Sequence, residues 1–295
     1  ILLAFFLGIA NAFDAPARQS FVLELVSRQD LTNAIALNST MFNLATAFGP
    51  AVGGLIYAAL GPGWCFTLNA ISFLAVIAAL LLMRLQVIPA PRRANSTWAD
   101  LQAGLKYVAA HGVVRTVILN LAVISLFGVS FVALMPAWAV KILGGDATTN
   151  GFLQSARGIG AMIGALMIAA VGGLIPRGKL VTLGGWVMPI LLLVFAAVRS
   201  LPLSLLMLVG VGWGFMIFAN SSNALLQTQV PDELRGRVMS IFTLAFFGLM
   251  PLGSLLAGAL AARIGEPLTV ILGALLVLAF QALVWLRFPQ LRHVE

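Results

Sequence analysis

Charged side chains inside long apolar runs are the residues best placed to do chemistry in this sequence. Asp14 and Arg18 are four residues apart in the first apolar run, so a helix places them on one face, with Pro16 between them. Charges at membrane depth are rare and usually face a cavity or a partner. We therefore expect this pair to line a substrate and coupling-ion pathway. A structural ion pair near the cytoplasmic interface is the alternative.

A third charge, Arg157, lies inside a later apolar run, among the glycines and small polar residues of the segment 154–160. An arginine at this depth could bind an anionic or catecholate-like substrate. It could also pair with an acid on another helix, or extend its head group to the outer interface. We expect Arg157 to belong to the substrate pathway, with the other two roles as alternatives.

An acidic and basic turn follows the seventh apolar run. It holds two acids and two arginines within seven residues: Asp232, Glu233, Arg235 and Arg237. As a solvated turn it needs no function. As the counterpart of the loop containing Arg28 and Asp30, it could form salt bridges that close the cytoplasmic side. We expect it to act as a cytoplasmic gate.

The remaining residues exclude most enzyme chemistry. The chain has one cysteine, so it can form no intramolecular disulfide and no cysteine-based metal cluster. Both histidines fall outside the apolar runs, and no acids cluster within them. A Gly-rich phosphate loop is also missing. We therefore predict no catalytic residues, no metal site, no cofactor and no enzymatic activity.

Composition places these residues in a membrane. Hydrophobic residues make up 61% of the chain and charged residues 9%, whereas about a quarter of a typical soluble domain is charged. A spanning helix needs about 20 mainly apolar residues. The sequence thus predicts an all-α polytopic membrane protein with nine spans: Ile1–Val26, Ala34–Leu60, Cys65–Leu85, Val113–Val140, Asn150–Gly173, Leu180–Val198, Leu203–Leu226, Val238–Ala262 and Leu268–Arg287.

The placement of basic residues sets the topology. With the tail after the ninth span taken as cytoplasmic, twelve of the seventeen basic residues fall inside and three fall in outside loops. This bias follows the positive-inside rule, so the net charge of +8 reflects topology and lipid head groups, not a nucleic-acid partner. The longest connection, residues 86–112, is cytoplasmic. Within it, Trp98, Leu101, Leu105 and Val108 form one helical stripe, typical of an interfacial helix or of a solvated linker helix.

The second apolar run contains the motif Gly49-Pro50-x-x-Gly53-Gly54. Proline and glycine persist in lipid-embedded helices as kinks and close-contact faces, because the backbone has no water to bond instead. The motif resembles the Gly-Pro-x-x-Gly-Gly pattern in the fifth helix of major facilitator superfamily transporters that export by antiport. That resemblance implies a hinge at these four residues.

An internal repeat supports the same architecture. Pro50 matches Pro251, and other paired features keep an offset of about 201 to 204 residues. Parallel repeats of six spans build major facilitator transporters. In the second half, the polar cluster 220–223 takes the place of the first acid–arginine pair. We therefore expect Asn220 and Asn223 to line the cavity between the halves.

Several separated blocks resemble the enterobactin-exporter-like, transmembrane secretion effector branch of this superfamily, among them 8–19, 33–38 and 230–238. The resemblance implies helices four to twelve of twelve, with helices one to three missing. It implies a partial N-terminal half at 1–85, a cytoplasmic linker at 86–112 and a six-helix C-terminal half at 113–295.

The resemblance also implies a function. We expect a monomer in the bacterial inner membrane that exports a small hydrophobic or amphipathic molecule, drug-like or siderophore-like, by proton antiport. A proton-coupled importer and a non-transporting sensor or partner protein are the alternatives. The Gly-Pro motif favours export over import. A sensor would need a soluble output domain, and no soluble stretch in the sequence exceeds the linker.

Overall fold

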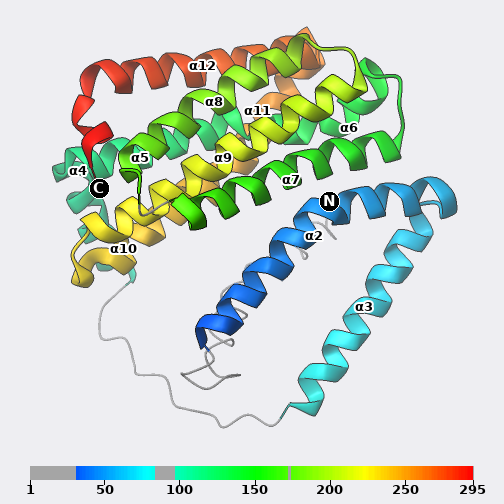
Figure 1. The fold of residues 1–295 in the computed structure, drawn as a ribbon, viewed down its shortest axis with the longest axis horizontal. Helices are drawn as coiled ribbons and strands as arrows, with labels where there is room; N and C mark the ends of the chain where they lie inside the picture. Colours follow the sequence, from blue (N-terminus) through cyan, green and yellow to red (C-terminus); the bar gives the residue numbers. More distant parts are fainter. Residues whose placement is uncertain (1–30, 84–96, 172–173, 295) are drawn as a thin grey trace. The chain divides into compact units, whose positions relative to one another are not determined.

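The computed structural model describes residues 31–83, 97–171 and 174–294 (Figure 1). The first predicted span, with Asp14 and Arg18, lies outside these residues. Throughout the described residues the structure is helical, without strands. The elements are α2 Leu31–Leu60, α3 Pro62–Leu82, α4 Thr97–Ala110, α5 Gly112–Val123, η1 Ile124–Gly128, η2 Ser130–Leu134, α6 Met135–Ala137, η3 Trp138–Ile142, α7 Ala147–Val171, α8 Arg177–Ala197, α9 Leu201–Gln229, α10 Asp232–Thr243, η4 Leu244–Gly248, α11 Leu249–Ile264, α12 Glu266–Arg287 and η5 Pro289–His293.

Eight helical stretches within the described ranges are long and apolar enough to cross a membrane. They match the second to ninth predicted spans, with ends that differ by a few residues. Two starts differ by six residues: the span Thr40–Leu60 starts after the predicted Ala34, and the span Asp232–Ile264 starts before the predicted Val238. The first two turns of α10 contain the acids and arginines that the sequence predicted as a loop. Asp232 and Glu233 lie in the first turn of α10, where negative charges interact favourably with the helix dipole and favour a helix start.

The chain separates into two compact units. One comprises Ile1–Ala45 and Leu68–Pro91, and the other comprises Thr46–Thr67 and Arg92–Glu295. The second unit therefore contains the end of α2, the linker helix α4 and all six spans of the C-terminal half.

Its centre is formed by α9, which packs along α7 on one side and α8 on the other (Figure 1). Glycines allow these helices to approach closely. A Cβ atom added at Gly184 of α8 would lie 2.5 Å from the carbonyl oxygen of Gly214 in α9. Close packing of small residues is the main source of helix association in lipid, where apolar burial gives little driving force.

The first span of this half, Gly112–Ile142, is not one continuous α-helix. A π-helical turn, η1, and a 3-10 turn, η2, separate α5 from α6, and a second π turn, η3, follows. Irregular turns of this kind leave the regular helical bonding pattern and often occur at functional hinges. The outer end of this span is fixed to α12 by an ion pair of 2.6 Å between Lys141 Nζ and the buried Glu266 carboxylate.

The linker helix α4 packs against α10. Asp100 of α4 forms an ion pair with Arg237 of α10 at 2.9 Å. The two helices cross closely at Gly104, where an added Cβ atom would lie 2.9 Å from the Ile241 side chain. The predicted four-residue stripe is divided in the structure. Val108 is buried in the bundle and Leu101 packs against its core, whereas Trp98 and Leu105 are exposed.

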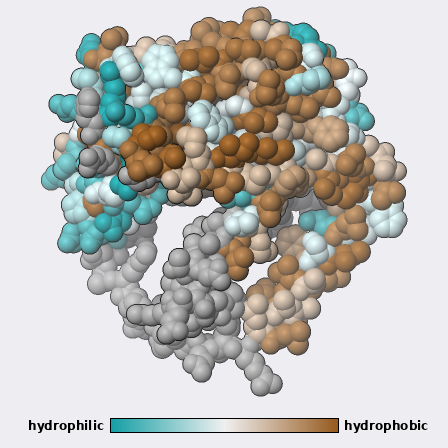
Figure 2. All heavy atoms as spheres, viewed as in Figure 1, coloured by the Kyte–Doolittle hydropathy of each residue, from teal (hydrophilic) through white to brown (hydrophobic). Residues whose placement is uncertain are grey.

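Hydropathy follows the expected membrane arrangement in this unit. Figure 2 shows hydrophobic residues over the sides of the spans and hydrophilic residues gathered at the end that carries α4 and α10. Large exposed apolar side chains on the outer helices, such as Leu272, Leu276 and Leu283 of α12, suit contact with lipid.

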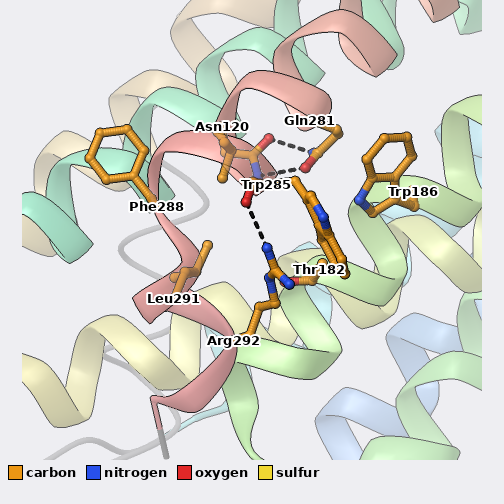
Figure 3. A pocket seen from close by; sticks show the side chains of 9 residues that line it. Asn120, Thr182, Trp186, Gln281, Trp285, Phe288, Leu291 and Arg292 are labelled. Carbon is orange, nitrogen blue, oxygen red and sulfur yellow. Dashed lines mark hydrogen bonds between the residues drawn. The ribbon is translucent and has the colours of Figure 1, made fainter.

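A buried pair of amides joins α5 to α12 (Figure 3). Asn120 donates to Gln281 Oε1 at 3.3 Å, and Gln281 donates to Asn120 Oδ1 at 2.7 Å. Both side chains are buried, and they line a small pocket beside Trp186, Trp285 and Arg292. The Arg292 guanidinium lies 3.3 Å above the Trp285 ring and donates to its backbone carbonyl at 2.6 Å. The two reciprocal hydrogen bonds between Asn120 and Gln281 thus fix one part of the pocket lining.

We predict that this amide pair stabilises the bundle as a unit. Gln281→Leu should cost about 1–3 kcal/mol of unfolding free energy, because it leaves the Asn120 amide buried without a partner. The double variant Asn120→Leu/Gln281→Leu should cost less than the sum of the two single variants, with a coupling of about 0.6–1.7 kcal/mol. Denaturant unfolding in detergent micelles measures this cycle. Additive losses would show that the two amides act independently.

Candidate functional site

The end of α2 crosses α7 through small residues. A Cβ atom added at Gly54 would lie 2.8 Å from the Ala147 carbonyl oxygen and 3.2 Å from the Gly151 Cα. In the reverse direction, a Cβ at Gly151 would lie 2.5 Å from the carbonyl oxygen of Pro50. At this crossing the two backbones touch without intervening side chains, and any larger residue would separate them.

The contact continues for two turns along both helices. The Ala51 backbone N–H donates to Ser155 Oγ at 2.9 Å, a bond between residues 104 positions apart. One turn further, Gly158 packs against the Thr46 carbonyl, and a Cβ there would lie 2.8 Å from the Ala47 Cα. Pro50 has no N–H to donate to the Thr46 carbonyl. The proline therefore changes the backbone bonding where α7 comes closest.

The four residues of the predicted hinge do not contribute equally. Pro50 and Gly54 face α7, whereas an added Cβ at Gly49 or Gly53 would meet nothing within 4 Å. The partner surface on α7, made by Gly151, Ser155 and Gly158, was not among the predicted site residues. Its spacing of four and three residues between small side chains is the sequence signal that could have identified it.

A cavity of about 460 Å³ lies beside this crossing, between α2, the α6–η3 segment and α7. Its polar lining comes from Tyr57 on α2 and from Asp146, Asn150 and Gln154 at the start of α7. Prolines and glycines form much of the rest. The volume falls in the range of pockets that bind small molecules, about 300–1,000 Å³.

Asp146 caps the N-terminus of α7. Its Oδ1 accepts the Thr149 backbone N–H at 3.0 Å and the Thr149 hydroxyl at 3.3 Å. The bond from the Thr149 N–H holds the pKa of the Asp146 carboxyl below its usual value. Asp146 is exposed, so it presents a negative charge at the cavity at neutral pH.

Arg157 lies on the same face of α7 as the polar cavity residues, three residues after Gln154 and seven after Asn150. Two other faces of α7 are occupied, because Gly158 contacts α2 and Gly160 contacts the Val209 carbonyl of α9. Arg157 is half-buried. Its Nε is buried without a hydrogen-bond partner, and no acid in the described ranges pairs with it.

The predicted pathway residues of α9, Asn220 and Asn223, lie nearer the C-terminal end of that helix than the level of Arg157. The Arg157 carbonyl is level with Gly212, and Asn220 follows eight residues, about 12 Å, further along the helix. Asn220 is exposed and Asn223 is half-buried, accepting a bond of 2.5 Å from Gln227. The structure therefore does not gather Arg157 and the two asparagines into one cluster.

The predicted gate residues all lie on α10. Arg235 pairs with Asp232 within the same helix, one turn apart. Arg237 instead pairs with Asp100 of the linker helix, a partner that sequence reasoning missed. The loop containing Arg28 and Asp30, which we expected to face these residues, lies outside the described residues.

The His, Cys, Asp and Glu side chains of the described residues are scattered over the structure. No group of three or more His, Cys, Asp or Glu side chains is close enough there to hold an ion. The site consists of a helix crossing, a cavity and two charges of opposite sign on α7.

The chain is similar in sequence to a known protein family and to several characterised transporters. The family model described as "Transmembrane secretion effector" matches residues 1–295. The multidrug efflux pump Tap of Mycolicibacterium fortuitum is 29% identical over 303 residues, which cover the whole of this chain and 73% of Tap. The staphyloferrin A transporter of Staphylococcus aureus is 26% identical, covering 87% of this chain and 64% of that protein.

Two further comparisons agree with these. The enterobactin exporter EntS of Escherichia coli is 27% identical over 270 residues, which cover 89% of this chain and 63% of EntS. Among solved structures, an inward-facing bacterial homologue of the human lysosomal transporter Spinster superposes with a TM-score of 0.63 at 14% identity, covering 94% of this chain and 75% of that one. The superposition supports the fold alone.

The α2–α7 crossing makes a direct prediction about two adjacent glycines. Gly54→Ala should separate the helices, because its Cβ would press on the backbone of α7, whereas Gly53→Ala should be tolerated. Disulfide formation between cysteines placed at Ala51 and Ser155, in a Cys65→Ser background, measures their separation. We expect several-fold slower cross-linking for Gly54→Ala and an unchanged rate for Gly53→Ala. Equal rates in both variants would contradict the packing described above.

Proposed function

Because the chain belongs to the transmembrane secretion effector family of the major facilitator superfamily, we propose that it exports a small hydrophobic or amphipathic molecule by proton antiport. Members of this family are transporters, so the chain is a membrane transporter and not an enzyme. With its apolar spans and bacterial relatives, it is a multi-pass protein of the bacterial inner membrane.

The observation that carries the proposal is the glycine and proline crossing of α2 and α7. A tight contact between the N-terminal and C-terminal spans at the predicted outer end supports a state closed to the outside. Alternating access requires such contacts to form and break as the two halves rock about a central site. The Gly-Pro pattern resembles that of antiport exporters, which favours export over proton-coupled import.

Arg157 is the residue we propose for substrate contact. An arginine without an acidic partner among the described residues is costly in a membrane unless it meets a ligand, water or lipid head group. Three relatives are named for multidrug efflux, for staphyloferrin A and for enterobactin. These names support a drug-like or siderophore-like substrate here. Asp14, Arg18, Asn220 and Asn223 complete the proposed pathway.

A proton gradient should drive this transport. Efflux of a fluorescent amphipathic drug from cells that express the protein should stop when a protonophore collapses the gradient. Efflux that continues unchanged would exclude proton coupling.

Arg157→Gln should reduce efflux of anionic substrates about tenfold or more, and Arg157→Lys should retain part of it, since a buried charge contact is worth several kcal/mol at most.

We also propose that α10 forms part of a cytoplasmic gate, with Asp232, Glu233, Arg235 and Arg237. The contact of Arg237 with the linker helix supports this role, because it fastens the connection between the halves to the end of a span. The pairing of Arg235 with Asp232 is local to one helix and exposed, so it should matter less.

Separate variants test the gate. Arg237→Gln should raise inward leak of substrate several-fold in inverted vesicles, and the exchange Asp100→Arg/Arg237→Asp should restore part of the seal. Arg235→Gln is the matched control, with a smaller increase expected. Unchanged leak in Arg237→Gln would remove the gate from the proposal.

A further inference from the structure

The cavity beside the α2–α7 crossing has a distinctive charge. Among the described residues that line it, Asp146 alone carries a formal charge. Tyr57, Asn150 and Gln154 add neutral hydrogen-bonding groups, and the prolines of α2 and α6 add apolar walls. A largely apolar pocket with a few converging polar groups and one carboxylate is suited to an organic ligand that carries one positive charge.

The carboxylate is held in place and remains available. Both hydrogen bonds from Thr149 go to Oδ1, which fixes the orientation of the side chain. Within the described ranges, Asp146 takes part in no ion pair. Its charge is therefore free to face a ligand in the cavity, while the helix cap keeps the group from rotating away.

The neighbouring amides extend the polar surface inward. Gln154 donates to Asn150 Oδ1 at 3.4 Å, so the two amides form a continuous strip one turn long on α7. Arg157 follows on the same face. Eleven residues separate it from Asp146, a rise of about 16 Å. One helix face thus carries a negative charge at its outer end, amides in the middle and a positive charge further in.

We propose that this cavity is a subsite for the cationic group of an amphipathic substrate, with Asp146 as its counter-charge. The inference rests on the proposed export function and adds to it. Arg157 would receive an anionic or electron-rich group, and Asp146 a protonated amine or another organic cation at the outer end. Compounds with a positive charge on an apolar body should bind there in preference to neutral or anionic compounds of the same size.

Two probes of nearly equal size and opposite charge test this preference. Binding of tetraphenylphosphonium and of tetraphenylborate to the full chain in detergent is measured at equilibrium, without any ion gradient. Asp146→Asn removes the charge and keeps an N-cap, because asparagine caps helices as well as aspartate does. Asp146→Glu is the charge-retaining control. Thermal unfolding of each variant confirms that it is folded.

Asp146→Asn should weaken phosphonium binding about three- to fivefold, the effect of one partly solvated charge contact. It should leave borate binding unchanged or stronger, and Asp146→Glu should keep most of the phosphonium affinity. Equal phosphonium affinity in Asp146→Asn and the unaltered chain would overturn the inference. So would a parallel loss of both probes, which would mean that the cavity had merely changed shape.

The same measurement separates this inference from the proposed function. Arg157→Gln should weaken borate binding and spare phosphonium binding. Because no gradient is applied, a failure of proton coupling in the efflux assay leaves the binding result intact. Conversely, gradient-driven efflux in cells with no charge selectivity at Asp146 would retain the exporter and reject the cationic subsite.

Discussion

The close approach of two helix backbones at the α2–α7 crossing is the constraint on which the rest of the site depends. In lipid, apolar side chains gain little by leaving one hydrocarbon surface for another. Helices associate where small residues let backbones touch and where polar groups find partners across the interface. The crossing meets both conditions, with Gly54 against Gly151 and the Ala51 N–H bonded to Ser155.

From this contact follows the position of the cavity. Once α2 rests on one face of α7 and α9 rests on the opposite face, two faces of α7 remain. One carries exposed apolar residues such as Phe152 and Ile163, which suit lipid. The other carries Asn150, Gln154 and Arg157, which lipid would penalise. On this polar face, Asn150 and Gln154 line the cavity, and Arg157 follows one turn further along α7.

At the opposite end of the spans, the linker helix α4 packs against α10. Asp100 and Arg237 pair at partial exposure, so their direct contribution to stability is small. Their value is geometric, because the pair and the close crossing at Gly104 fix where the connection between the two halves meets α10. This supports placing the gate at Arg237 and not along the whole acidic and basic turn.

The sequence by itself determined the second to ninth spans and the family, since these depend on local hydropathy and on the spacing of motif residues. The orientation of the spans remains a prediction from the distribution of basic residues. It also identified Arg157 as a charge at membrane depth. The tertiary structure alone decided that Gly54 and not Gly53 makes the contact, that Arg237 pairs with Asp100, and that Asp146 lines the cavity. These pairings join residues about 95 to 140 positions apart or depend on which helix face a neighbour covers, and no periodicity along one segment contains that information.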